Sequence, residues 1–179
     1  MKNTFAVLVA ILLMVVLYKN KPELKLAIPD VKTVQDVVQI TSKDKKQIEC
    51  LTHNIYYEAG YEQYKGQLAV AMVTLRRAAT AHYPKTLCGV VKQKTNQVCQ
   101  FSWWCDEQKK YKSIKNIFTA REKNKLEDIR AVATYAFLYH KDIKDDTGGA
   151  LFYHNTSVDP GWNLKRTTKI GNHIFYRKS

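Results

Sequence analysis

A helix that is apolar on nearly every side constrains this fold more than any other feature of the sequence. The residues from Tyr64 to Ala79 predict a helix, and the middle of that helix, Leu68–Val73, is entirely apolar. A helix without a polar face has to be covered all round by other parts of the chain. The 179 residues suffice for one compact domain and an N-terminal extension, so we expect this helix at the centre of the domain.

The preceding helix carries a glutamate beside its apolar stripe. Ile48, Leu51, Ile55 and Ala59 recur at helical spacing, and Glu58 stands at the edge of the stripe that they form. A carboxyl group pressed against apolar side chains loses hydration, which raises its pKa toward neutrality. A general acid needs such a pKa. The alternative is a partly buried glutamate that pairs with a lysine or an arginine.

Local signals set the limits of these two helices. Thr41 or Ser42 can cap the helix that runs to about Ala59, and a polar break at residues 60–63 separates it from the central helix. The segment from 82 to 106 contains a proline, a glycine and three of the cysteines, so we expect it to be rich in loops.

The last part of the chain predicts one more helix and a small β element. Apolar residues at helical spacing mark a third long helix: Leu126, Ile129, Val132, Ala133, Ala136 and Phe137. Ala150–His154 predicts a strand, and Thr168–Ile170 with His173–Tyr176 predicts a hairpin around Gly171 and Asn172.

Four cysteines, Cys50, Cys88, Cys99 and Cys105, form an even set without the Cys-x-x-Cys spacing of a zinc ribbon. In an oxidising compartment they pair as two disulfides, and three pairings are possible. We favour Cys50 with Cys88, which ties the first helix to the segment after the central helix. Cys99 with Cys105 then closes a short loop around two tryptophans. In a reducing cytosol the four thiols would stay free.

The N-terminus predicts an export signal. Lys2 precedes an apolar run over residues 5–18, and charged residues follow it. As a helix this run spans about 21 Å, less than the ~30 Å of a bilayer core, and no small-x-small cleavage site follows. We therefore expect residues 1–21 to form a signal anchor or signal peptide, 22–46 a tether, and 47–179 a domain outside the inner membrane.

The net charge of +13 predicts anionic partners. Nucleic acid is not expected, because lysine and arginine are spread along the chain without a recognised nucleic-acid-binding motif. An exported domain meets the anionic cell envelope instead.

Several motifs occur in a fixed order along the domain: Glu58-Ala59 with Glu62, Gly66–Ala71, Tyr83–Val91, Cys99–Trp103, Phe152–His154 and Ile170–Phe175. Together they resemble the SleB/CwlJ family of cell wall hydrolases, and the resemblance covers about Cys50 to Tyr176. The chain departs from the family pattern at Gly60-Tyr61, where Arg-Gly is common, and at Arg76-Arg77, where an Asn-Arg pair is common.

The resemblance implies an α+β fold, a mainly helical lysozyme-like domain with a small C-terminal antiparallel β element. It implies that residues 47–179 form a catalytic domain that cleaves peptidoglycan glycan strands between N-acetylmuramic acid and N-acetylglucosamine. Spore-germination members of the family act as lytic transglycosylases. The family's catalytic acid precedes the alanine of the first motif, which here is Glu58. We expect no metal and no cofactor, and the second partner is the inner membrane, bound through residues 5–18.

Glycosidic cleavage usually uses two carboxylates. Glu62 is the nearest candidate partner for Glu58, but Gly60 breaks the helix between them, and Glu62 can equally meet the N-terminal dipole of the next helix. A lytic transglycosylase needs only one carboxylate, because the 6-hydroxyl of the muramic acid attacks the anomeric carbon.

Further candidates for substrate binding are polar groups that stand among aromatic residues: Gln100, Ser102, Tyr153 and His154. Each of these side chains can also serve a structural role.

Three other functions are considered. The five histidines lack the spacing of a zinc site such as His-Glu-x-x-His, which argues against a zinc amidase. A cysteine peptidase would need a free thiol, which disulfide pairing consumes. A basic, non-catalytic envelope-binding module stays open. Among lytic roles, phage lysis, wall remodelling and spore germination all stay open, as does hydrolysis against anhydro-sugar formation.

Overall fold

The computed structural model describes residues 39–106 and 119–179. The chain divides into two units, Met1–Gln39 and Ile40–Ser179, and every element below belongs to the second unit. The predicted anchor lies outside the described residues, as do residues 22–38 of the predicted tether, whereas residues 42–46, also assigned to the tether, form the start of α2. Among the helices that the structure describes, none combines the length and the hydropathy of a membrane-spanning helix.

Four helices of the described chain are α2 (Ser42–Ala59), α3 (Tyr64–Ala79), α4 (Leu87–Val91) and α6 (Ala120–Tyr139). The predictions for α2 and α3 are confirmed, and α6 begins six residues before the first apolar position that predicted it. The chain also forms a short helical turn at residues 102–106. The segment 82–106 is rich in loops, as predicted, but it also contains the short helix α4, which the sequence analysis did not predict.

Side-chain caps explain where the long helices begin. The Thr41 hydroxyl accepts the Asp44 N–H, and the Asp44 carboxylate in turn accepts the Thr41 N–H. Thr119 and Glu122 form the same capping box at the start of α6. Such boxes satisfy N–H groups that have no partner within the helix. Gly60 takes the C-cap position of α2, so the predicted break before Glu62 is confirmed.

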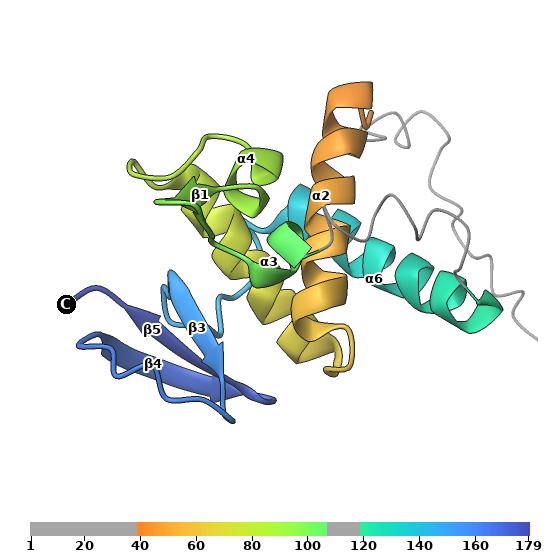
Figure 1. Cartoon of the computed structure of the whole chain (residues 1–179). Coiled ribbons are helices and arrows are strands. Elements are labelled where there is room, and N and C mark those ends of the chain that lie inside the picture. The colour runs from red at the N-terminus through yellow and green to blue at the C-terminus, as the bar shows by residue number, and fades with distance from the viewer. Residues whose placement is uncertain (1–38, 107–118) are drawn as a thin grey trace, which may run out of the picture. The chain divides into compact units, whose positions relative to one another are not determined.

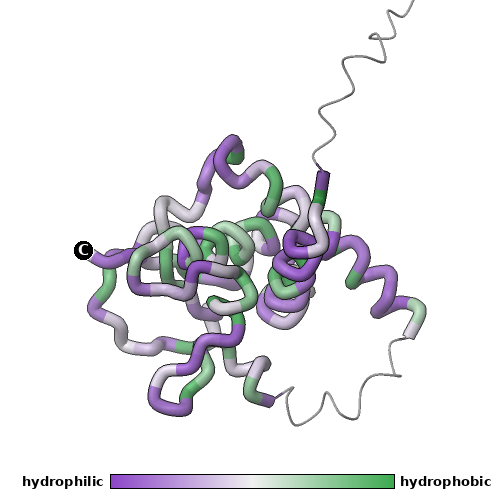
Figure 2. The backbone as a smooth tube through the Cα atoms, turned by 90° about the horizontal axis from the view of Figure 1, so that it is seen from above, coloured by the Kyte–Doolittle hydropathy of each residue, from purple (hydrophilic) through white to green (hydrophobic). Residues whose placement is uncertain are grey.

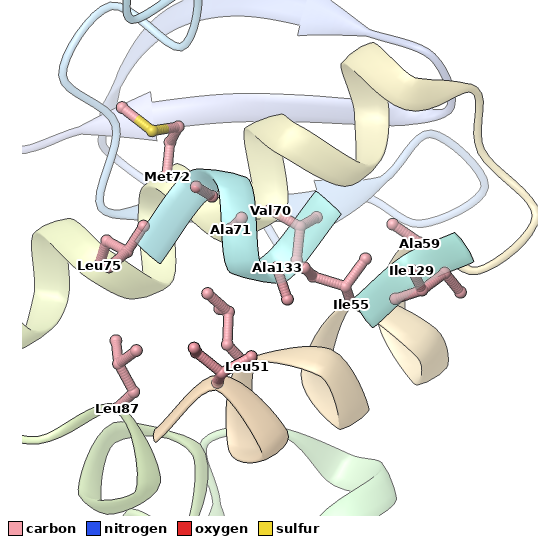
Figure 3. Packing of buried hydrophobic residues seen from close by; sticks show 12 residues of the cluster. Leu51, Ile55, Ala59, Val70, Ala71, Met72, Leu75, Leu87, Ile129 and Ala133 are labelled. Carbon is pink, nitrogen blue, oxygen red and sulfur yellow. The ribbon is translucent and has the colours of Figure 1, made fainter. Parts of the chain in front are cut away.

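The apolar helix α3 lies at the centre, as predicted. Val70, Ala71 and Val73 are fully buried. Helix α2 packs against α3, α4 and α6, and α3 also packs against α4 and α6. Figure 3 shows α2 side chains such as Leu51 and Ile55 pointing toward the apolar side chains of the surrounding helices. In Figure 2 the first turns of α6 are hydrophilic, which fits their exposure.

A three-stranded antiparallel sheet follows the helices. Its strands are β3 (Phe152–Asn155), β4 (Lys165–Ile170) and β5 (His173–Arg177), in the order β3-β5-β4. The turn between β4 and β5 uses Gly171 with φ +56°, which a glycine adopts readily. A short hairpin of β1 (Lys94–Thr95) and β2 (Val98–Cys99) precedes α6. The predicted hairpin is confirmed, and the fold class is α+β.

One face of the sheet packs on α3 (Figure 1). Phe175 of β5 is fully buried there, in a cluster with Ala69 and Val73 of α3 and with Ala150. This contact brings β3 close to the C-terminal end of α2.

Two disulfides hold the loop-rich segment. Cys50 of α2 bonds to Cys88 of α4, and Cys99 bonds to Cys105. Both predicted pairings are confirmed. The first disulfide fixes the position of α4 against α2, and the second closes a loop with a sequence separation of 6 residues.

Candidate active site

Glu58 lies at the C-terminal end of α2, half-buried between the helices and β3. Burial raises the pKa of its carboxyl group, while a hydrogen bond from Tyr153 and the charge of Arg77 partly oppose that rise. No lysine or arginine of the described residues forms an ion pair with Glu58. The alternative of a charge-paired structural glutamate is therefore not supported. A carboxyl group with a raised pKa keeps a proton available for donation.

Tyr153 holds this carboxyl group. The hydroxyl of Tyr153 donates to Oε2 of Glu58 at 3.1 Å. Burial and the neighbouring Glu58 raise the pKa of Tyr153 well above its ordinary value, so the hydroxyl stays a donor. The ring packs against His173 and Phe175 on the inner side of the sheet. The sequence suggested Tyr153 as a substrate ligand, and its position indicates that it orients Glu58.

Arg77 is a buried cation that the sequence prediction missed. Only 3% of its surface is exposed, and its Nε donates to the carbonyl of Leu151 at 2.8 Å. Three aromatic rings surround its guanidinium group at 5.3–6.0 Å: Tyr83, Phe101 and Phe152. Its positive charge lowers the pKa of Glu58 against the effect of burial. An arginine at the end of an apolar helix is the only sequence signal for this role.

A platform of aromatic rings includes Tyr57, the residue before Glu58 in α2. Tyr57 stacks on Trp103 with ring centres 4.5 Å apart and an interplanar angle of 18°. Trp104 meets Trp103 edge to face at 6.0 Å. Tyr57 is 37% exposed, so the platform reaches the surface. We refer to Tyr57, Trp103 and Trp104 as the aromatic platform.

Asn54 anchors this platform to the helices. Its side chain is fully buried, and its Oδ1 accepts the Trp103 indole N–H at 3.1 Å. Its Nδ2 donates to the Thr74 hydroxyl of α3 at 3.0 Å. A buried amide satisfied on both sides fixes the ring orientation. The sequence prediction did not identify Asn54, because its partners are distant in the chain.

Gln100 and Ser102 lie in the loop that the Cys99–Cys105 disulfide closes. Both residues are exposed, while Phe101 between them is buried. No hydrogen bond within residues 39–106 and 119–179 joins either side chain to Glu58 or Tyr153. Their predicted contact with substrate stays a prediction.

Glu62 lies against the β4–β5 turn. Its Oε1 accepts the backbone N–H of Asn172 at 3.1 Å and lies 3.9 Å from Nδ1 of His173. Only 11% of its side chain is exposed. Its carboxylate packs so closely on Gly171 that a side chain there would collide with it. Glu62 thus connects the start of α3 to the sheet. Its carboxylate binds the β4–β5 turn and not Glu58.

His154, the neighbour of Tyr153, points to the other face of the sheet. Its ring stacks on Tyr176, and its Nε2 lies 3.0 Å from the Tyr176 hydroxyl. Side chains of consecutive strand residues alternate between the faces. The structure therefore separates two residues that the sequence placed in one candidate site.

The described residues contain no cluster of three or more histidine, cysteine, aspartate or glutamate side chains that could hold a metal ion.

Comparison with known proteins identifies the relatives of this chain. Residues 61–176 match the family described as Cell Wall Hydrolase, and this match begins three residues after Glu58. A spore cortex-lytic enzyme of Bacillus cereus is 30% identical over 131 residues, which are 72% of this chain and 43% of that protein. One from Oceanobacillus iheyensis is 29% identical over 133 residues, 72% of this chain and 40% of that protein. The chain thus spans about two fifths of the length of these relatives.

A solved structure has the same fold. The catalytic domain of the germination-specific lytic transglycosylase SleB from Bacillus anthracis matches with a TM-score of 0.50 and 27% sequence identity. The match covers 76% of this chain and 96% of that domain. The motifs, the α+β fold and the family match agree, and the chain belongs to the cell wall hydrolase family.

Proposed function

We propose that this protein cleaves the glycan strands of peptidoglycan between N-acetylmuramic acid and N-acetylglucosamine, with Glu58 as the general acid. The observation that carries the proposal is the half-buried Glu58, which forms no ion pair with a described residue and accepts a hydrogen bond from Tyr153. Burial keeps its pKa raised, so a proton is available for the glycosidic oxygen.

The first step breaks the bond between the anomeric carbon and the glycosidic oxygen. Glu58 gives its proton to that oxygen, and the sugar develops oxocarbenium character. The resulting Glu58 carboxylate is stabilised by the Tyr153 hydroxyl and by the nearby charge of Arg77. These two groups make proton donation less costly, because they favour the ionised form that the step produces.

The position of Glu62 favours a second step that uses only one carboxylate. Glu62 is the nearest other glutamate in the sequence, and its carboxylate is engaged with the β4–β5 turn. This supports a lytic transglycosylase, in which the ionised Glu58 takes the proton of the muramic acid 6-hydroxyl as that oxygen attacks the anomeric carbon. The product is a 1,6-anhydro sugar, and no water is consumed.

The aromatic platform provides a surface for sugar rings beside the acid. Trp103 and Tyr57 are fixed by stacking and by the Asn54 hydrogen bond, so little conformational entropy is lost when a sugar packs against them. Gln100 and Ser102 are exposed in the same loop as Trp103, and their side chains can bind the acetamido groups of the sugars.

The site of action that we propose is the cell envelope, outside the inner membrane, with residues 5–18 as a signal anchor and 22–46 as a tether. Two disulfides support export, because disulfides persist in oxidising compartments. Fractionation with N-terminal sequencing tests this proposal. A mature protein that begins between Leu17 and Leu26 would show a cleaved signal peptide and refute the anchor.

Mass spectrometry of digested sacculi tests the reaction. Wild-type protein should release muropeptides with anhydro-muramic acid ends, and Glu58→Gln should not. Glu127→Gln is the matched control, because it makes the same substitution at an exposed position of α6. Reducing sugar ends would indicate hydrolysis, and new amino groups would indicate an amidase or a peptidase. Unchanged sacculi would favour the binding module.

A further inference from the structure

The outer face of the C-terminal sheet carries aromatic and basic side chains, and all of them except Phe152, whose ring also contacts Arg77, lie outside the proposed reaction. Tyr153 points from β3 toward Glu58, so Phe152 and His154 on either side of it point to the opposite face. Tyr176 of β5 lies directly across from Phe152 and shares that face. Figure 1 shows the sheet beside α3, which covers its inner face and leaves this outer one uncovered by any labelled helix.

Trp162 completes an aromatic cluster on the outer face. Its ring meets three others at 5.5–6.1 Å between centres: Phe152, His154 and Tyr176. His154 in turn stacks on Tyr176 at 5.3 Å. These contacts fix Trp162, yet 40% of its surface stays exposed. A tryptophan that served only to anchor its loop would be covered by the loop, whereas this ring presents a surface to solvent.

Exposed cations flank the aromatic cluster. Arg166 of β4 pairs with Tyr176 across the sheet, and Lys169 pairs with Ile174, so both strand positions belong to the outer face. Both side chains are exposed. Residues 150–179 contain five lysines and arginines and a single acidic residue, Asp159. Asp159 accepts the N–H of Gly161 within its own turn. The outer face is therefore positively charged beside flat rings.

This combination fits a ligand with sugar rings and carboxylates. Aromatic faces pack on sugar rings, and arginine and lysine pair with carboxylate groups. A peptidoglycan strand offers both, because its glycan carries stem peptides that end in carboxylates. Nucleic acid is less suited, since lysine and arginine of this domain are not gathered into a recognised nucleic-acid-binding motif.

We propose that this outer face, made of His154, Trp162, Arg166, Lys169 and Tyr176, is a second, non-catalytic binding surface for peptidoglycan strands. The rings pack on the sugars, and Arg166 and Lys169 pair with stem-peptide carboxylates. The inference rests on the proposed substrate but not on the cleavage reaction. Because the surface lies across the sheet from Tyr153, it holds the insoluble wall without occupying the site of Glu58.

Binding to sacculi tests the proposal in a background that does not cut. The full-length Glu58→Gln protein is sedimented with insoluble sacculi, either intact or stripped of their stem-peptide carboxylates by carbodiimide-mediated amidation, which leaves the cross-links in place. Trp162→Ala should weaken binding to both preparations, by roughly fivefold. Arg166→Glu with Lys169→Glu should weaken binding to intact sacculi by roughly tenfold at low salt, and binding to stripped sacculi much less.

The matched control is Arg121→Glu with Lys123→Glu, the same charge change at two exposed positions in the first turn of α6. This control variant should bind intact sacculi with the affinity of the Glu58→Gln protein. The proposal would be overturned if both double variants lost the same amount of binding. It would also be overturned if Arg166→Glu with Lys169→Glu lost as much binding to stripped sacculi as to intact ones. Should Trp162→Ala fail to fold by circular dichroism, the double variants decide alone. Cleavage by the wild type is measured separately, so the binding proposal and the reaction can fail independently.

Discussion

Two glutamates four positions apart lie in opposite environments. Glu58 lies half-buried in the last turn of α2, and the hydrogen bond that it accepts comes from a tyrosine of the distant strand β3. Glu62 follows the helix break, and its carboxylate accepts a backbone N–H from the β4–β5 turn and lies near His173. Burial raises the pKa of Glu58 against the opposing effects of Tyr153 and Arg77, whereas Glu62 connects the residues before α3 to the sheet.

The comparison shows how one residue type takes two roles. A carboxylate that accepts a backbone N–H from another element is held in position. A carboxyl group in a dry site with one neutral donor can exchange its proton. We therefore assign the chemistry to Glu58 and the connection of the two layers to Glu62, and four substitutions test that division.

The largest expected effect separates the two residues by activity. Glu58→Gln keeps the shape of the side chain and removes the proton, so turnover should fall at least about a hundredfold. Glu62→Gln keeps a hydrogen-bond acceptor for Asn172 and should retain activity within about tenfold. Release of soluble muropeptides from sacculi measures both variants. A loss for Glu62→Gln as large as that for Glu58→Gln would give Glu62 a direct chemical role.

The second effect separates them by stability. Glu62→Ala removes the acceptor of the Asn172 N–H and opens space beside Gly66 and Gly171. A hydrogen bond to a charged group contributes about 1.5 kcal/mol or more, so unfolding in urea should shift to lower concentrations by that free energy. Glu62→Gln is the control and should lose less. A fully stable Glu62→Ala protein would contradict the connecting role.

A smaller effect concerns the hydrogen bond between Tyr153 and Glu58. This bond lowers the pKa of Glu58, so Tyr153→Phe should raise that pKa further. The alkaline limb of the pH–rate profile, which reports loss of the acid's proton, should then move to higher pH. Turnover should fall by roughly fivefold, because the ionised product loses one donor. An alkaline limb that stays in place would show that Tyr153 does not act on Glu58.

The smallest expected effect concerns how the stability of the folded protein changes with pH. The folded pKa of Glu58 is raised above its unfolded value, so its contribution to stability is fully present below the unfolded pKa. That contribution is lost as the pH rises through the folded pKa. Glu58→Gln does not titrate there, so it should gain stability relative to the wild type over this window. Thermal unfolding at several pH values measures the difference, and parallel curves for the two proteins would contradict it.

Local signals predicted the elements that local interactions build. The bounds of α3 and the start of α2 follow from caps and apolar spacing, and both matched the structure. Helix α4 was missed because its five residues depend on the Thr86 cap and on the disulfide to Cys50. A helix that short is stabilised mostly by tertiary contacts.

The candidate site was predictable only in part for the same reason. Glu58 could be identified from the stripe that it borders. Arg77 could not, because the three rings around it come from separate segments of the chain. Tyr153 and His154 were placed together although alternation along a strand sends them to opposite faces. Which of the two faces Glu58 depends on the packing of the sheet on the helices, which the sequence does not show.

The most direct test of the central assignment is the pKa of Glu58 itself. Carbon-13 NMR of protein labelled at the glutamate carboxyl carbons follows each titration, and the spectrum of Glu58→Gln identifies the resonance of Glu58. The account predicts that this resonance titrates above the ordinary range of glutamates, and higher still in Tyr153→Phe. Titration of Glu58 within or below the ordinary glutamate range would contradict its assignment as the proton donor.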